Sequence, residues 1–168
     1  DIFEQFFGAG FTGRSQGKRL ETYKISISFL EAAKGVEKEF NIDGKRRKIK
    51  IPAGVDDGQR IRFKDFILYI DVLPDKVFKR EGNDIFVTIN LTFSQAVLGT
   101  EIEVPTLTEP VKVRVKAGTQ PNTLIRLRGR GIKQVSGFGI GDLYIRLMVE
   151  IPTRLTPRQK DLVRQLGL

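Results

Sequence analysis

Apolar and polar residues alternate with a period of two along most of the chain, which indicates β-strands. In the first clear strand Tyr23, Ile25 and Ile27 share one side, and the same alternation returns 64 positions later. Helical spacing occurs only in short stretches. The chain is therefore predicted to be mostly β, with two tandem small β-sandwich domains, one short helix in each, and a C-terminal helix.

The two predicted domains are copies of one module. Residues 20–64 lie over residues 84–128 without a gap, and 11 of the 45 pairs are identical. Chance would give roughly three identities at a fixed offset. The identities fall where structure constrains the residue, as at the predicted turn glycines Gly54 and Gly118. Each copy is expected to fold in the same way, with mostly antiparallel strands.

Each copy carries a helix start after its first strand. Residues 28–31 fit the capping pattern S-x-x-E, and residues 92–95 fit its T-x-x-Q counterpart. Both helices are expected to span one or two turns and to end at Gly35 or Gly99.

The two ends of the chain lie outside the repeat. The N-terminal stretch alternates phenylalanine with glycine and is expected to be a flexible tether. At the other end Thr156 is predicted to cap a helix with Pro157 in its first turn. From the residues alone, this helix is expected to pack on its own module. The predicted division is 1–16 for the end of a Gly/Phe-rich linker, 17–82 and 83–154 for the two domains, and 155–168 for the C-terminal helix.

The composition excludes several kinds of chemistry. The chain has no cysteine and no histidine, so disulfides, thiolate metal sites and Ser-His-Asp or Cys-His catalysis are impossible. The paired glutamates Glu37 and Glu39, with their counterparts Glu101 and Glu103, are interpreted as solvent-facing strand positions. We therefore expect neither an enzyme nor a bound metal or cofactor. No apolar stretch approaches the ~18 residues that would span a membrane.

The formal net charge of +9 suggests an acidic partner and leaves a nucleic-acid-binding function open. The densest basic run, residues 45–48, suits a solvated hairpin and an anionic site equally well. The glycine-rich segment between Arg128 and Asp142 is a weak match to a phosphate loop, because a strand is expected after it. It is interpreted as a flexible loop. The first copy lacks this segment, since Lys64 adjoins Asp65 directly, and so tight a connection is expected to strain the strand pair.

Several motifs, in order along nearly the whole chain, resemble the C-terminal half of a DnaJ-type co-chaperone. The motifs are ISISFLEAAKG at 25–35, IPAGVDDGQRIR at 51–62, VFKREGND at 77–84, AVLGTEIEVP at 96–105, GDLY at 141–144 and LTPRQ at 155–159. The Phe/Gly stretch before them fits the same family. In members with zinc, Cys-x-x-Cys-type repeats are inserted in the first module. Here Asp43–Lys48 fills that place, so the chain resembles the zinc-less class.

The resemblance implies that unfolded client polypeptides bind on the first module. Matched position by position, it puts an apolar client groove at Tyr23, Ile25, Phe40, Ile42 and Leu68. Periodicity alone slightly favours a core role for these residues, and a groove requires that the first strand lie at a sheet edge. The second copy is expected to act as a spacer.

The resemblance also implies partners. A DnaK-type chaperone is expected to place its acidic tail at a basic patch near Lys38 and Lys45. A homodimer is expected to form through the C-terminal helix, with a seam of Leu162, Val163 and Leu166. The implied role is a cytoplasmic chaperone in protein folding and the stress response. Since some zinc-less relatives bind DNA, nucleic-acid binding is kept as the alternative.

Overall fold

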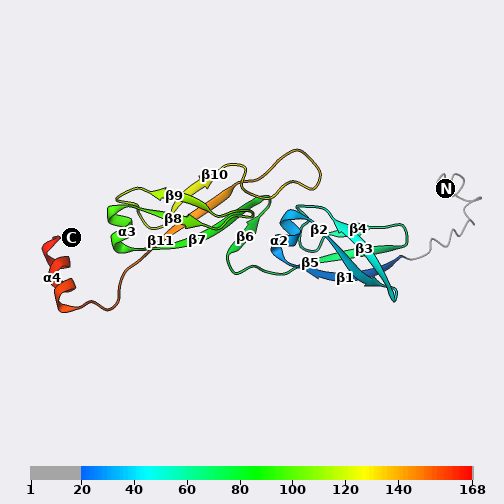
Figure 1. The fold of residues 1–168 in the computed structure, drawn as a ribbon, viewed down its shortest axis with the longest axis horizontal. Coiled ribbons are helices and arrows are strands. Elements are labelled where there is room, and N and C mark those ends of the chain that lie inside the picture. The colour runs from blue at the N-terminus through cyan, green and yellow to red at the C-terminus, as the bar shows by residue number, and fades with distance from the viewer. Residues whose placement is uncertain (1–19, 168) are drawn as a thin grey trace, which may run out of the picture.

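The computed structural model describes residues 20–167, so the predicted Gly/Phe linker at 1–16 lies outside the described residues. The chain is mostly β, as predicted, and its two modules follow one another along the long axis (Figure 1). Helix α4 (Pro157–Gln165) lies beyond the second module. No helix within residues 20–167 has the length and apolar character needed to cross a membrane.

The first module is a three-stranded sheet covered by a two-stranded hairpin. The sheet has the order β1-β5-β4, with β1 at Glu21–Ile27, β5 at Phe66–Val72 and β4 at Arg60–Arg62. The hairpin joins β2 (Val36–Ile42) to β3 (Lys45–Ile51). Its turn, Asp43-Gly44, has positive φ at both residues, as the twist of a two-residue hairpin favours. Helix α2 (Phe29–Lys34) connects β1 to this hairpin.

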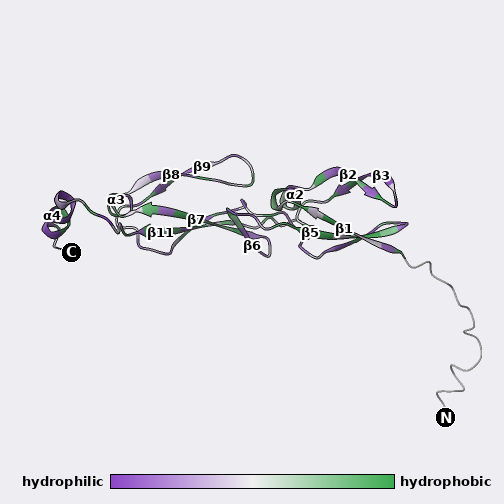
Figure 2. Cartoon of the chain, turned by 90° about the horizontal axis from the view of Figure 1, so that it is seen from below, coloured by the Kyte–Doolittle hydropathy of each residue, from purple (hydrophilic) through white to green (hydrophobic). Residues whose placement is uncertain are grey.

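The second module repeats this plan with one strand more. Its sheet has the order β10-β11-β7-β6, with β10 at Thr123–Leu127, β11 at Leu143–Glu150, β7 at Asp84–Thr92 and β6 at Phe78–Glu81. The covering hairpin consists of β8 (Thr100–Val104) and β9 (Val111–Val115), and helix α3 spans Phe93–Leu98. Figure 2 shows both hairpins on the same side of the two larger sheets.

The structure confirms the repeat and corrects one detail of the pairing. Tyr23 faces Leu68 across β1 and β5, and Val87 faces Ile145 across β7 and β11. Both of these pairs are parallel, whereas the other five strand pairs within residues 20–167 are antiparallel, so the modules are mostly antiparallel, as expected, except for this one pair in each. A parallel pair needs a crossover, and the helix and hairpin supply it in each module. Both predicted capping boxes are present, and Thr156, predicted as a helix cap, forms a third with Gln159.

Strand β6 belongs to the second module. It pairs antiparallel with the first half of β7, from Phe78 opposite Val87 to Glu81 opposite Asp84. The boundary predicted after residue 82 therefore moves to the link 73–77. Alternation within four residues cannot reveal which sheet a strand joins.

Arg80 on β6 ties the two modules together. Its guanidinium donates hydrogen bonds to the carbonyl oxygens of Val55 (2.6 Å) and Gly54 (2.9 Å) in the first module. It also pairs with the carboxylate of Asp56 at 2.6 Å. The side chain is largely buried, so these charge-assisted bonds are shielded from water.

Apolar contacts reinforce this junction. The rings of Phe29 on α2 and Phe78 on β6 stack with centroids 5.7 Å apart. Phe29 and Ala33 of the first module belong to the hydrophobic core of the second. The two modules are thus joined by an apolar contact and not only by the chain that links them.

The glycine-rich segment forms a short hairpin, which we call the finger (residues 129–141). Ile132 is fully buried, and its N–H donates to the carbonyl of Asn83 at 2.7 Å. The N–H of Gly131 bonds to the carbonyl of Gly141 at 2.8 Å, and Lys133 bridges to Ile140 further out. The expectation of a flexible loop is therefore wrong for the stem, because backbone pairing and a buried isoleucine hold it.

The direct junction of Lys64 with Asp65 closes as a tight hairpin between β4 and β5. The N–H of Phe63 donates to the carbonyl of Phe66 at 2.8 Å, and neither turn residue has a positive φ. The two rings stack with centroids 4.7 Å apart. Neither a positive φ nor a cis peptide bond marks the predicted strain at this turn.

Candidate functional site

The first module presents a free strand edge. Strand β1 is the outer strand of its sheet, and among the described residues it pairs only with β5. The carbonyl of Ile27 accepts from Leu73 on the β5 side at 2.9 Å. Because backbone groups alternate between the two edges of a strand, those of Thr22, Lys24 and Ser26 point to the open edge. These groups can pair with an added strand.

The five predicted groove residues come together beside this edge. They lie on β1, β2 and β5 and belong to one hydrophobic cluster. Leu68 and Ile42 are 0% and 1% exposed and Ile25 is also buried, whereas Tyr23 and Phe40 are only partly buried. A bound chain can therefore touch the two aromatic side chains, while the three aliphatic ones form the floor beneath them.

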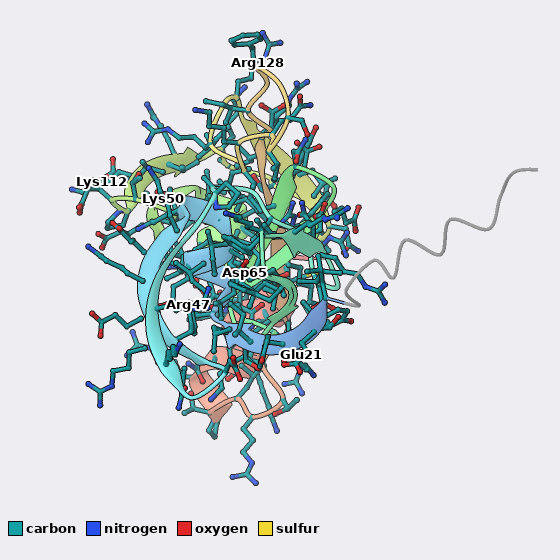
Figure 3. The ribbon with its side chains drawn as sticks, turned by 90° about the vertical axis from the view of Figure 1, so that its right-hand side faces the viewer. Glu21, Arg47, Lys50, Asp65, Lys112 and Arg128 are labelled. Atoms are coloured by element: carbon teal, nitrogen blue, oxygen red, sulfur yellow. The ribbon has the colours of Figure 1, made fainter. Side chains whose placement is uncertain are left out.

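A pocket of about 370 Å³ lies beside Tyr23 and Ile42, two of the predicted groove residues. It is lined by Leu20, Glu21, Tyr23, Ile42, Asp43, Arg47, Lys64, Asp65 and Phe66. The guanidinium of Arg47 lies 5.4 Å from the centroid of the Phe66 ring and 3.5 Å from the Asp65 carboxylate. Figure 3 looks onto this end of the module, where Arg47, Asp65 and Glu21 are labelled. The pocket combines aromatic walls with charges of both signs.

Arg47 and Phe66 were not predicted as groove residues. Arg47 belongs to the basic run at residues 45–48, which was not assigned to the groove. The period-two alternation of β3 does separate Arg47 from its neighbours Arg46 and Lys48, so the signal was available once the hairpin register was known. The place of Phe66 in the pocket depends on the Lys64–Asp65 turn, and no sequence pattern predicted the geometry of this turn.

Tyr23 is held by a neighbour on the same side of β1. Its hydroxyl donates a hydrogen bond to the carboxylate of Glu21, and this bond raises the pKa of Tyr23 to about 12. The ring meets that of Phe66 edge to face, with centroids 6.0 Å apart. The tyrosine thus stays neutral and presents a fixed apolar face to the groove.

On the face of β1 that is turned away from the apolar cluster, polar side chains bond to the neighbouring strand β5. Asp71 on β5 accepts from the Ser26 hydroxyl at 2.7 Å and pairs with Lys24 at 3.0 Å. The bond from Ser26, followed by that from Lys24, lowers the pKa of Asp71. These side chains leave the backbone edge of β1 unobstructed.

The two predicted basic residues share the groove side of the hairpin. Lys38 lies on the same face of β2 as Phe40, and Lys45 is the cross-strand partner of Ile42. Lys38 forms an ion pair with Glu31, which lowers the pKa of that carboxyl. Lys45 is exposed and makes no ion pair among residues 20–167. It is the freer of the two cations.

The opposite face of the hairpin is close to neutral. Glu37 lies across from Lys50, and Glu39 lies across from Lys48. Lys48 also pairs with Glu37 at 3.3 Å, and the second module repeats this pair as Lys112 with Glu101. The prediction that the paired glutamates face solvent is confirmed, since all four are exposed.

Helix α4 is exposed on all sides. It buries no residue, and the three predicted seam residues Leu162, Val163 and Leu166 lie in water. The expectation that the helix packs on its own module is therefore wrong. Its single apolar face is left for a contact outside the described chain.

Comparisons with known proteins agree on one family. The sequence model of the DnaJ C terminal domain matches residues 22–152. The "Chaperone protein DnaJ" of Geobacillus thermodenitrificans is 46% identical over 136 residues, and that of Parageobacillus thermoglucosidasius is 44% identical over 137. Each alignment covers 72% of this chain and 36% of the relative, so the chain spans about a third of these proteins.

A more distant relative aligns over almost the whole chain. The "Chaperone protein DnaJ" of Ruminiclostridium cellulolyticum is 32% identical over 260 aligned positions, which cover 99% of this chain and 69% of the relative. Because the alignment is longer than the 168 residues of the chain, the relative carries inserted segments that this chain lacks.

Proposed function

The chain belongs to the DnaJ C-terminal domain family, and on that premise we propose that it holds extended segments of unfolded client proteins at the open edge of β1. Holding such segments keeps them from aggregating. The client adds a strand next to β1, pairs with its outward backbone groups, and lays alternate side chains over the apolar cluster.

One observation carries the proposal: a free strand edge runs beside two half-exposed aromatic side chains that lie on a fully apolar floor. Tyr23 comes from β1 itself and Phe40 from β2, and both pack against the same apolar cluster. Backbone pairing does not depend on the client's sequence, while the apolar cluster selects segments rich in large apolar residues. This combination suits a protein that accepts many unfolded chains.

The same surface suits a partner chaperone of the DnaK type. Lys45 is exposed and unpaired among the described residues, and Lys38 lies two positions from Phe40 on the same face. An acidic tail that pairs with Lys45 lies next to the client path, which would let the partner meet the client as it is released. Lys38 contributes less, because Glu31 already neutralises it.

We propose further that two chains associate through α4. An apolar face of Leu162, Val163 and Leu166 on a nine-residue helix has no partner within the described residues. A helix this short is not stable alone, so packing against a second copy would stabilise it. The resulting dimer presents two client grooves to one unfolded chain.

The test is suppression of client aggregation by the chain and by its Tyr23→Ser, Phe40→Ser double variant. We expect at least tenfold more of the variant to be needed for the same suppression, since both accessible apolar contacts are gone. Circular dichroism and thermal unfolding report whether the variant is folded. Ile25, Ile42 and Leu68 are unsuitable for this test, because polar residues there would disrupt the core.

A matched control is Leu124→Ser, which removes an exposed apolar side chain of the second module. It should suppress aggregation as well as the parent chain does. A folded double variant with full activity would contradict the proposal.

The alternative of a nucleic-acid-binding module stays a prediction. The cross-strand pairing of Lys48 and Lys50 with glutamates reduces the positive potential of the basic hairpin. Binding through the net charge should fall steeply with salt. A mobility shift with duplex DNA at low salt tests this directly.

A further inference from the structure

The finger carries an apolar tip that nothing in the described chain covers. Phe138 is fully exposed, and Val135 and Ile140 on either side of it are exposed as well. A bare aromatic ring is a large apolar surface, roughly 200 Å². Scattered single apolar residues are ordinary on protein surfaces, but the finger exposes both Phe138 and Ile140 near its tip, while Val135 lies towards Gly54 of the first module.

The tip is ordered by its own backbone and by Gln134. The N–H of Gln134 donates to the carbonyl of Gly139 at 2.9 Å, which closes the turn over residues 135–138. The Gln134 side chain fills the space beneath, so that a Cβ on Gly137 or Gly139 would lie 2.7 Å or 3.0 Å from it. A side chain at either glycine would have to displace the end of the Gln134 side chain, and the Phe138 ring between them is fully exposed.

The stem beneath this tip is basic. Arg130 and Lys133 of the stem, and Arg128 just before it, are exposed, and residues 127–141 contain no acidic residue. Figure 3 shows Arg128 at the outer edge of the molecule. An apolar contact with cations around it complements a segment in which a large apolar residue has acidic neighbours.

The finger is fixed to the module that holds the client groove. The carbonyl oxygen of Lys133 approaches Gly54 so closely that a Cβ there would lie 2.0 Å from it. The N–H of Gly54 in turn donates to the carbonyl of Ala32 at 2.8 Å, and Ala32 lies in the same apolar cluster as the groove floor. The distance from finger to groove is therefore set by packed backbone.

We infer that the finger is a second anchor for the client chain, with Phe138 contacting an apolar residue and the basic stem contacting acidic residues around it. The inference rests on the proposed function of the groove. A client long enough to reach both points is held twice, and the fixed spacing makes the second contact effectively intramolecular. The anchor would favour long, acidic unfolded chains over short peptides.

The experiment compares two probes on the whole chain by fluorescence anisotropy. One is a labelled seven-residue apolar peptide, which is long enough to pair with β1 alone. The other is reduced, carboxymethylated α-lactalbumin, an unfolded acidic protein. Phe138→Ser should weaken binding of the long probe about tenfold and leave the short peptide within twofold. Leu98→Ser, which removes another highly exposed apolar side chain elsewhere on the second module, should change neither.

A second variant tests the charges. Replacing Arg128, Arg130 and Lys133 together by glutamine should weaken the long probe at low salt and flatten its dependence on salt. If Phe138→Ser bound the long probe as tightly as the parent chain does, and still bound the short peptide, the second anchor would be wrong while the groove would stand. If the parent chain bound neither probe, the proposed groove itself would be wrong. If Phe138 mattered only for binding to anionic vesicles of phosphatidylcholine and phosphatidylglycerol, the finger would be a lipid contact and the inference would be wrong.

Discussion

The first strands of the two modules occupy the same place in the repeat but meet different neighbours. Strand β7 has β6 paired along residues 84–87, so half of its outer edge is closed. The corresponding half of β1 has no such strand among the described residues. One short strand at the module junction thus distinguishes a half-covered edge from an open one.

The side chains beside the two edges differ in the same sense. Where the first module has the half-exposed Tyr23 and Phe40, the second has Val87 and Val104, which are buried. Valine is small enough to lie wholly within the core, whereas the aromatic rings reach out of it. The comparison teaches that one scaffold can be a binding surface or a support, depending on two residue sizes and one added strand.

The largest effect is expected at the junction that joins the modules. Gly54 and Gly118 hold the same place in the repeat, and both have positive φ, at 90° and 77°. Gly54→Ala adds a clash with the Lys133 backbone, whereas a Cβ on Gly118 meets nothing within 4 Å. Gly118→Ala should cost about 1–2 kcal/mol of unfolding free energy from its φ alone, and Gly54→Ala roughly 3 kcal/mol or more. Urea unfolding of both variants measures the difference, and equal losses would show that the modules do not press together there.

The next effect comes from giving the first module the residues of the second. A Tyr23→Val, Phe40→Val variant should remain folded, because the second module has valine at both of these places. It should nevertheless bind a labelled client peptide about tenfold more weakly, which corresponds to ~1.4 kcal/mol of binding free energy. Anisotropy titration gives the affinity. Undiminished binding would mean that the aromatic side chains are not what distinguishes the modules.

A smaller effect is expected from blocking the edge without touching the apolar side chains. Thr22 is exposed and directs its N–H to the open edge, where proline is tolerated. Thr22→Pro should weaken client binding about fivefold, since one pairing N–H is lost, while thermal unfolding changes little. Tyr23→Pro is the contrasting variant, because its N–H faces β5 and its loss should destabilise the module. If Thr22→Pro bound clients normally, strand addition at β1 would be wrong.

The smallest effect is a titration that reports on the groove alone, because Val87 in the second module cannot ionise. The pKa of Tyr23 is about 12, raised by its bond to Glu21. Folding therefore favours the neutral phenol. This contribution is complete below pH 10 and is lost as the pH rises through 12. The absorbance difference at 295 nm between the parent chain and Tyr23→Phe should show this late step. Glu21→Gln should move it towards pH 10, and no movement would exclude Glu21 as the cause.

Much of this arrangement could be predicted from the sequence, because it depends on local chemistry. The alternation of Tyr23, Ile25 and Ile27 gives the buried face of β1, and the capping pattern at residues 28–31 gives the start of α2. The 64-residue offset of the repeat then predicted the same strand and the same helix start in the second module. The five residues that the family resemblance assigned to the groove do share one cluster.

What the sequence could not reveal depends on contacts between distant segments. The parallel pairing of β1 with β5 and the transfer of β6 to the second sheet join residues that no local pattern links. The burial of Ile132 makes the finger an ordered hairpin, although its glycines alone suggest a loop. For the same reason the alternation of apolar residues could not separate the buried Ile42 from the half-exposed Phe40.

Hydrogen exchange at single amides, with and without a bound client peptide, tests the central claim most directly. The outward N–H groups of Thr22, Lys24 and Ser26 should exchange at least tenfold more slowly once the client pairs with them, because they then donate to its carbonyls. The amides of Thr88 and Asn90, at the corresponding places of β7, should be unchanged. A client that binds without protecting these three amides, or that protects β7 instead, would contradict the account.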